Sequence, residues 1–377
     1  MRVKWDIFCS VVDNFGDIGV TWRLARQLVA EHDLEVCLWV DDLETFCRLC
    51  PQGSHLHSEQ FLQGVRLRHW PTEWRPVAAA DVVIEAFACQ LPDAYIEAMA
   101  RRPQPSLWLN LEYLSAEDWV EGCHGLPSLQ AKGLHKFFFF PGFTPQTGGL
   151  LRETGLLEQR QRFQQDPYAR SAFLRRLGVD LQPHTRLISV FAYSNPALDS
   201  WLDALAAESQ PSQLLIPEGR ILADLQRWLG SEPLAVGDSH TRGSVCLHIL
   251  PFLSQDDYDR LLWSCDLNLV RGEDSFVRAQ WAGRPLLWQI YPQQDDAHLD
   301  KLDAFVNLYT RGLSPAADSA LRAQWYAWNT TADMQASWQA QLSAWPELTQ
   351  HAENWCQQQS KQTNIAATLV QFYVNWL

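Results

Sequence analysis

The chain has no apolar run that approaches the roughly 20 residues of a membrane-spanning helix. Its N-terminus enters a predicted strand at once and lacks the basic and then apolar layout of a signal peptide. Positive charge is also scarce, because 30 lysines and arginines face 44 aspartates and glutamates and leave a net charge of −14. These features argue against a membrane span, secretion and general binding to nucleic acids or anionic membranes. We therefore expect a cytoplasmic protein.

Several common catalytic signatures are absent as well. The sequence contains no Walker A motif, no G-x-S-x-G and no H-E-x-x-H, which argues against the common kinases and hydrolases as the leading interpretation. The nine cysteines are scattered and odd in number, which is typical of free thiols in a reducing compartment. Cys47 and Cys50, followed by His55 and His57, are a candidate zinc site, but residues 42–50 have the pattern of an ordinary helix. We favour the helix and expect no metal.

The chain does contain a repeated alternation of strands and helices. Its 377 residues are enough for two domains that each have a core. Apolar runs in the first half predict strands at 5–12, 35–40, 65–70, 81–87, 106–111 and 136–140. A second series predicts strands at 187–193, 213–217, 245–249, 267–270 and 285–289, and everything from residue 316 onward has a helical pattern. Apolar strands separated by helices are typical of parallel sheets that are covered on both faces.

The predicted domain boundaries follow this pattern. We expect an N-terminal Rossmann-like domain over 1–150, a helical connection over 151–184 and a second Rossmann-like domain over 185–360. In a transferase with this plan, the first domain would bind the acceptor of the transferred group and the second would bind the nucleotide sugar. The amphipathic stretch 361–377 is expected to be a helix that packs back on the body. Two successive α/β domains suggest two facing doubly wound sheets with a cleft between them. GT-B glycosyltransferases have this plan, although architecture alone does not name a function.

Residues 271–280 are the most informative stretch and read Arg-Gly-Glu-Asp-Ser-Phe-Val-Arg-Ala-Gln. A predicted strand runs into this stretch, and a helical pattern begins near Asp274. The N–H groups of a first helical turn can hold phosphate oxygens, Arg271 adds a positive charge and Glu273 can accept from hydroxyls. The motif therefore indicates a pocket for a nucleoside diphosphate or a nucleotide sugar. The alternative is a capped helix with a solvated, charged start.

Residues 13–19, Asp-Asn-Phe-Gly-Asp-Ile-Gly, form a second turn between a strand and a helix. Gly16 and Gly19 permit the close approach of another chain or a sugar. The turn has no G-x-G-x-x-G pattern and no basic residue, and Asp13 and Asp17 contribute two carboxylates instead. A phosphate would be repelled there, whereas a cation or a nucleophile that needs a base would be favoured.

These two motifs, and residues 5–28 as a whole, resemble the EarP family of bacterial protein-arginine rhamnosyltransferases. The resemblance extends over the whole chain. It implies a GT-B fold, dTDP-β-L-rhamnose as the donor and an arginine of translation elongation factor P as the acceptor. It further implies an inverting transfer that needs no metal or other cofactor. The modified factor would then rescue ribosomes that stall on polyproline.

The resemblance also implies roles for individual residues. Asp17 matches the general base, Asp13 its partner carboxylate, and Glu273 an acid that activity requires. Asp274 and Ser275 fall where the family binds the phosphates and sugar of the donor. The other positions are an acceptor loop of Asn14, Phe15, Gly16 and Gly19, and donor-pocket residues Tyr193, Phe252, Gln255 and Tyr291. Arg271 joins the donor set because of its charge.

Two other readings remain open. The chain could be a GT-B transferase that uses another nucleotide sugar or another acceptor. It could also be a non-catalytic module that only binds the elongation factor. A carboxylate turn in one domain and a phosphate-type turn in the other favour an enzyme, because an adaptor would need neither.

Overall fold

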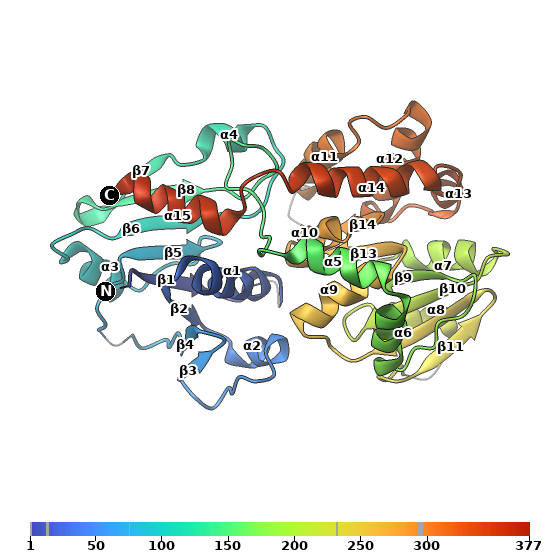
Figure 1. The fold of residues 1–377 in the computed structure, drawn as a ribbon, viewed down its shortest axis with the longest axis horizontal. Coiled ribbons are helices and arrows are strands. Elements are labelled where there is room, and N and C mark those ends of the chain that lie inside the picture. The colour runs from blue at the N-terminus through green and yellow to red at the C-terminus, as the bar shows by residue number, and fades with distance from the viewer. Residues whose placement is uncertain (1, 13–14, 75, 231–232, 293–296) are drawn as a thin grey trace. The chain divides into compact units, whose positions relative to one another are not determined.

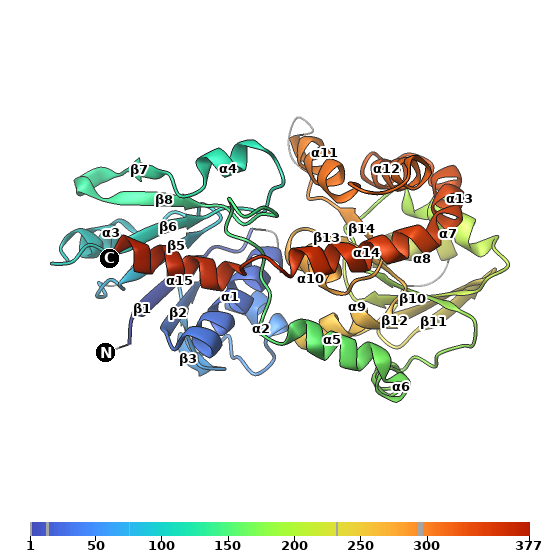
Figure 2. The same cartoon turned by 45° about the horizontal axis from the view of Figure 1, so that its top comes forward.

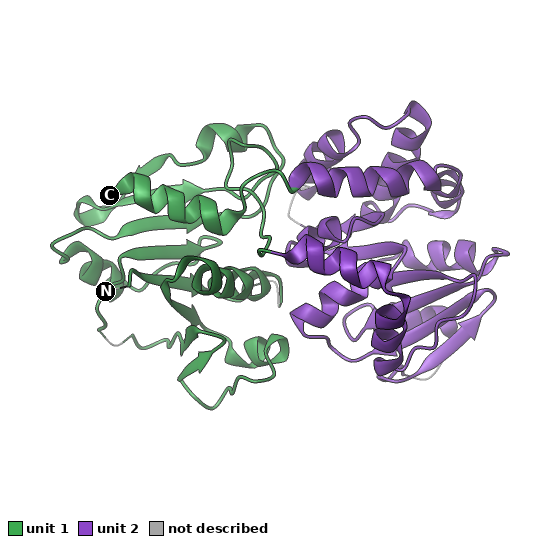
Figure 3. Ribbon diagram, viewed as in Figure 1, with its two compact units in different colours: residues 1–154, 360–377 green, residues 155–359 purple. Residues whose placement is uncertain are grey.

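The computed structural model describes residues 2–12, 15–74, 76–230, 233–292 and 297–377. It divides the chain into two compact units, each built around a sheet (Figure 3). Unit 1 comprises residues 1–154 and 360–377, and unit 2 comprises residues 155–359. The stretch predicted as a connection, 151–184, contributes the first two helices of unit 2.

The described residues of unit 1 form an eight-stranded sheet in the order β3-β4-β2-β1-β5-β6-β8-β7 (Figure 1). Its strands are β1 (Lys4–Cys9), β2 (Glu35–Val40), β3 (Glu59–Leu62), β4 (Val65–His69), β5 (Val82–Ala86), β6 (Leu107–Leu111), β7 (Pro127–Leu129) and β8 (His135–Phe139). Its helices are α1 (Gly16–His32), α2 (Leu43–Leu49), α3 (Asp93–Ala100), α4 (Trp119–Cys123) and α15 (Ile365–Trp376), with a short 3-10 turn (Ala131–Gly133).

The described residues of unit 2 form a six-stranded sheet in the order β11-β12-β10-β9-β13-β14. Its strands are β9 (Arg186–Val190), β10 (Ser212–Pro217), β11 (Ser239–Arg242), β12 (Val245–Leu250), β13 (Leu267–Arg271) and β14 (Leu286–Gln289). Its helices are α5 (Leu156–Gln165), α6 (Pro167–Arg176), α7 (Leu198–Ala206), α8 (Leu222–Leu229), α9 (Gln255–Ser264), α10 (Asp274–Trp281), α11 (Ala297–Tyr309), α12 (Pro315–Asn329), α13 (Gln335–Ser343) and α14 (Trp345–Gln359).

Both sheets are parallel at their centres, as the apolar strand runs predict. In unit 1 the strand order reverses at β1, which lies between β2 and β5, and in unit 2 it reverses at β9, which lies between β10 and β13. Ligands of such sheets bind outside the carboxyl ends of the strands at these reversal points. The antiparallel edge strands β3, β7 and β11 were not predicted, because they are short and largely exposed.

Helix α15 completes unit 1, where it lies beside α1 on one face of the sheet (Figures 1 and 2). The Tyr373 ring meets the Trp5 ring edge-on at 6.0 Å, and the Phe372 ring meets Phe137 at 5.6 Å. The segment that leads into α15 passes so close to Gly149 that a side chain there would lie 2.2 Å from a carbonyl oxygen of the segment. Residues near both ends of the chain therefore share one core.

The run of phenylalanines at 137–140 is only partly the buried strand that its composition predicts. Phe139 and Phe140 are buried, whereas Phe137 and Phe138 remain partly exposed. The reason is position, because β8 is covered on its outer side only by the short edge strand β7. In the described parts of the chain, no helix combines the length and apolar composition that crossing a bilayer would require.

Packing of α15 predicts a measurable loss of stability. Leu369 is fully buried on this helix, so Leu369→Ala is expected to lower the free energy of unfolding by about 2–5 kcal/mol through lost burial and the cavity left behind. Val374 lies on the same helix with 56% of its surface exposed, and Val374→Ala is expected to change stability by only about 0.5 kcal/mol. Urea unfolding of both variants checks this, and equal effects would contradict the packing described.

Candidate functional site

In unit 1 the predicted site residues gather at the carboxyl end of β1. The chain leaves β1 at Cys9 and enters α1 at Gly16, and Asp17 lies in the first helical turn. Asp13 and Asn14 lie outside the described residues, so their roles stay predictions. Phe15 is the N-cap residue of α1, and its carbonyl accepts from the N–H of Gly19 at 2.9 Å.

Asp17 is only 2% exposed, and hydrogen bonds hold both of its carboxylate oxygens. Val12 donates its backbone N–H to Oδ2 at 3.0 Å, and Tyr113 donates its hydroxyl to Oδ1 at 3.2 Å. Hydrogen bonds to a carboxylate favour its charged form and fix the direction of its oxygens. The arrangement suits a fixed anionic acceptor of hydrogen bonds.

Sequence reasoning missed the two aromatic residues at this edge. Tyr113 follows β6, and its ring stacks on that of Phe87, which follows β5, at 4.5 Å between centroids and 19° between planes. Both residues are half-buried. The available signal was position, because Phe87 ends one predicted strand and Tyr113 follows another, at the carboxyl edge of a parallel sheet. The order of strands in the sheet, which brings them to β1, cannot be read from local sequence.

In unit 2 the predicted donor residues lie at or after the carboxyl ends of four strands, β9, β12, β13 and β14. The guanidinium of Arg271 lies over the rings of Phe191 and Tyr193, with its central carbon 4.4 and 4.5 Å from the two ring centroids. Tyr291 meets the Tyr193 ring edge-on at 5.5 Å. Arg271 is 7% exposed, so it adds positive charge to this edge from within an aromatic setting.

The start of α10 is tied to neighbouring elements through its first residues. The hydroxyl of Ser275 accepts from the N–H of Arg271 at 3.1 Å and donates to the carbonyl of the same residue at 2.5 Å. Ser275 could contact a phosphate through its backbone N–H. Its hydroxyl could do so only if its hydrogen bonds to the Arg271 backbone were broken. The carboxylate of Asp274 accepts from the side-chain amide of Gln255 at 3.3 Å. This oxygen of Asp274 is therefore directed toward α9.

Three further predicted donor residues lie close in sequence to these elements: Glu273, Phe252 and Tyr291. Glu273 is the N-cap residue of α10 and makes no side-chain capping bond there, and it is half-buried. Phe252 is half-buried in the segment that joins β12 to α9. Tyr291 is 43% exposed, which is unusual for a large ring and leaves it available to a ligand.

A buried ion pair aligns the starts of α9 and α10. Arg278 donates through Nε and Nη2 to the two carboxylate oxygens of Asp259 at 2.9 and 2.6 Å, and both side chains are nearly inaccessible. Asp259 lies one turn after Gln255, and Arg278 lies one turn after Asp274. Helices α9 and α10 are therefore connected twice, by the Gln255–Asp274 hydrogen bond at their starts and by the Arg278–Asp259 pair one turn later. These contacts hold both helix starts at the same edge of the sheet.

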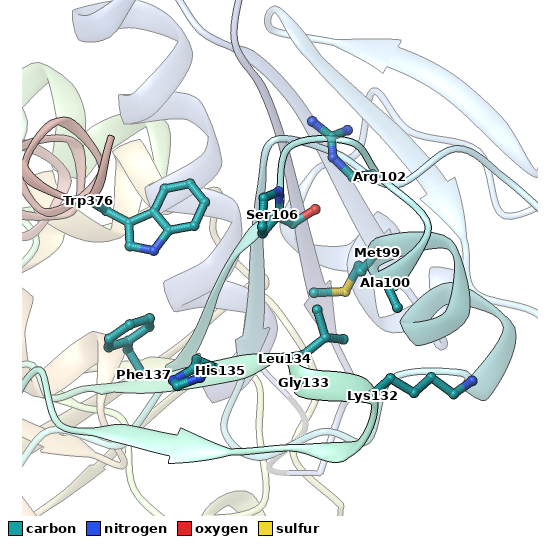
Figure 4. Close-up of a pocket in the computed structure, with 11 residues that line it drawn as sticks. Met99, Ala100, Arg102, Ser106, Lys132, Gly133, Leu134, His135, Phe137 and Trp376 are labelled. Atoms are coloured by element: carbon teal, nitrogen blue, oxygen red, sulfur yellow. The ribbon is translucent and has the colours of Figure 1, made fainter.

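A cavity of about 370 Å³ opens in unit 1 away from these residues (Figure 4). Residues around it include Met99 of α3, Ser106 before β6, His135 at the start of β8 and Trp376 of α15. It lies at the amino ends of β6 and β8, the opposite edge from Asp17, and no predicted site residue lines it.

The zinc site considered from the sequence is not formed. Within the parts of the chain that the structure describes, no group of three or more His, Cys, Asp or Glu side chains could hold a metal ion. Cys47, Cys50, His55 and His57 are all described, and the first two lie at the end of α2, as the helical pattern predicts.

Comparisons with known proteins agree on one family. The model of the family described as "Elongation-Factor P (EF-P) rhamnosyltransferase EarP" matches residues 5–374. A protein-arginine rhamnosyltransferase of Pseudomonas putida is 63% identical over 377 residues, which is 100% of both chains. A solved structure described as "Structural basis for EarP-mediated arginine glycosylation of translation elongation factor EF-P" is 47% identical, with a TM-score of 0.73 and full coverage of both chains.

A more distant likeness bears on the fold alone. The crystal structure of Acinetobacter baumannii MurG is 14% identical, covers 100% of both chains and has a TM-score of 0.51. Together with the two doubly wound sheets, these likenesses confirm the predicted GT-B glycosyltransferase fold class.

The buried pair predicts an unequal response of two arginines. Arg278→Leu removes the guanidinium that engages both oxygens of the buried Asp259 carboxylate, so the free energy of unfolding is expected to fall by about 3–5 kcal/mol. Arg260 of α9 pairs with Asp257, is 44% exposed, and shares that partner with Arg176. Arg260→Leu is therefore expected to cost less than about 1 kcal/mol. Urea unfolding followed by tryptophan fluorescence compares them; a small loss for Arg278→Leu would show that the pair does not anchor α10.

Proposed function

The chain belongs to the EarP family of elongation-factor P rhamnosyltransferases, and on that premise we propose that it transfers L-rhamnose from dTDP-β-L-rhamnose to an arginine of elongation factor P. The family match over residues 5–374 carries this proposal, because it includes both the turn of Asp17 and the start of α10. The donor and the inverting course are the finer parts of the proposal.

The acceptor chemistry is assigned to Asp17 of unit 1. A guanidinium is protonated, with a pKa above about 12, and its lone pairs are delocalised, so it is a poor nucleophile. A carboxylate can grip the guanidinium in a fixed plane by charge-assisted hydrogen bonds. The same carboxylate can take one proton as the C–N bond forms, so that free neutral arginine need not accumulate. The bonds from Val12 and Tyr113 hold Asp17 in one orientation for this task.

The donor chemistry is assigned to the edge formed by β9, β13 and α10 in unit 2. In an inverting transfer the nucleophile attacks the anomeric carbon opposite the departing dTDP, through an oxocarbenium-like state, and converts the β-linked sugar to an α-linked product. The departing diphosphate gains negative charge as its bond to the sugar breaks. Helix N-terminal amides stabilise such charge, and Arg271 adds a cation at the same edge. Tyr193, Tyr291 and Phe252 would contact the nucleoside or sugar, and Glu273 a sugar hydroxyl.

We also propose that the transfer uses no metal or other cofactor and takes place in the cytoplasm. Support for the first part is the cationic and amide character of the α10 start, which can balance the leaving charge by itself. Support for the second part is that all nine cysteines are free thiols.

The direct test is the intact mass of elongation factor P after incubation with this protein and dTDP-β-L-rhamnose, in the presence of a metal chelator. We expect a gain of one deoxyhexose, which disappears when the acceptor arginine is changed to lysine. Product stereochemistry by NMR then reports inversion or retention. Donor binding without any gain would reopen the acceptor, and binding of only another nucleotide sugar would replace the donor.

Asp17→Asn tests the base with almost no change of shape. The amide cannot take a proton, so transfer is expected to fall at least about 100-fold, which is the typical contribution of a general base. Affinity for the donor is expected to stay unchanged, because the donor residues belong to unit 2. Asp41→Asn, which removes a carboxylate that receives the Ser10 and Val11 donors near the same edge, serves as the control. Normal turnover of Asp17→Asn would remove it from the role of base.

A further inference from the structure

The side chain of Tyr113 donates its hydroxyl to Oδ1 of the buried Asp17 at 3.2 Å. Val12 donates its backbone N–H to Oδ2, a donor that side-chain substitutions other than proline leave in place. Tyr113 reaches Asp17 from β6 across the sheet, since β5 separates β6 from β1. A side chain that crosses a neighbouring strand to orient a buried carboxylate acts on the chemistry of that carboxylate as well as on packing.

The partner of Tyr113 is held by a strained backbone. Phe87 and Ala88 follow β5 and both have positive φ angles, of 57° and 55°. This left-handed conformation is costly for residues with a side chain, by about 1–3 kcal/mol each, and a bulky ring there is a genuine outlier. Such strain is concentrated at functional sites, where the surrounding structure holds it in place.

Three hydrogen bonds hold this turn. Phe87 donates its N–H to the carbonyl of Leu111 at 2.7 Å, and Ala88 donates its N–H to the side chain of Asn110 at 3.2 Å. Cys89 then donates back to the carbonyl of Ala86 at 3.2 Å. Asn110 is itself buried and also donates to the carboxylate of Glu112, next to Tyr113. The consequence of this costly geometry is that the Phe87 ring lies flat on the Tyr113 ring.

We propose that Tyr113, backed by Phe87, is a positioning and specificity-determining residue of the acceptor site: its hydroxyl orients Asp17, and the aromatic pair favours the flat guanidinium of arginine over an ammonium. This inference rests on the proposed function and deepens it. The stack remains partly exposed beside the carboxylate that would receive the acceptor.

The physical basis of this choice is the difference between the two cations. A guanidinium is planar and weakly hydrated, so it can stack on a ring while its edge donates to a carboxylate. An ammonium is compact and strongly hydrated, and it gains less from an aromatic surface. A stack that served only to cover the β5 turn would have no preference between them.

Tyr113→Phe tests the hydroxyl and keeps the ring. Loss of a hydrogen bond to a charged group is expected to lower kcat about 10- to 100-fold, with KM for the elongation factor within about twofold. Tyr168→Phe, at a tyrosine that is 84% exposed in unit 2, is the control and is expected to match the wild type. Wild-type kcat in Tyr113→Phe would overturn the positioning role.

Phe87→Leu tests the stack in a double-mutant cycle. Binding of the elongation factor is measured with arginine and with lysine at the acceptor position, for the wild type and for the variant. We expect the preference for arginine to shrink about two- to fivefold in the variant, the usual size of an exposed cation–π contact. An unchanged preference would overturn the specificity role.

The two proposals can fail separately in these experiments. If the wild type transfers no sugar to the factor, the proposed function fails, whereas the binding cycle still reports whether Phe87 discriminates the two cations. If the wild type transfers sugar and both variants behave like it, only the inference about Tyr113 and Phe87 fails. Melting temperature and dTDP affinity of each variant show that it is folded.

Discussion

The buried pair of Arg278 and Asp259 sets the geometry of the second sheet's carboxyl edge. Two charges removed from water are stabilising only when their hydrogen bonds are complete, and here both carboxylate oxygens are engaged by one guanidinium. The pair fixes α9 against α10 one turn behind their first residues. Because the contact tolerates little displacement, the amides at the start of α10 and the Gln255 side chain keep a constant relation to Arg271 and its aromatic neighbours.

The carboxyl edge of the first sheet carries a buried carboxylate, Asp17, where the edge of the second carries a buried guanidinium, Arg271. Asp17 is almost fully buried, and its oxygens accept hydrogen bonds from the backbone amide of Val12 and the hydroxyl of Tyr113. The two edges thus carry different groups: a buried guanidinium among rings in unit 2, and a buried carboxylate beside rings in unit 1.

What could be predicted from the sequence depended on whether the residues are contiguous. Asp17 and the stretch from Arg271 to Ser275 each lie within a single strand-turn-helix segment, so their place between the end of a strand and the start of a helix follows from the pattern alone. The pairing of Tyr113 with Phe87 depends on the order β1-β5-β6, which arises from tertiary packing. The hydrogen bonds between the Ser275 hydroxyl and the Arg271 backbone also could not be predicted, because a sequence motif does not show where a hydroxyl points.

Unit 1 is assembled from two stretches of chain that synthesis separates in time. Residues 155–359, the whole of unit 2, are made between them, and at about 5–20 residues per second this interval lasts roughly 10–40 s. Until α15 follows, the face of the first sheet that includes Trp5 and Phe137 lacks its cover of Tyr373 and Phe372. Unit 2, being continuous, can fold in that interval. The unit with the proposed base begins on the ribosome first and is completed second.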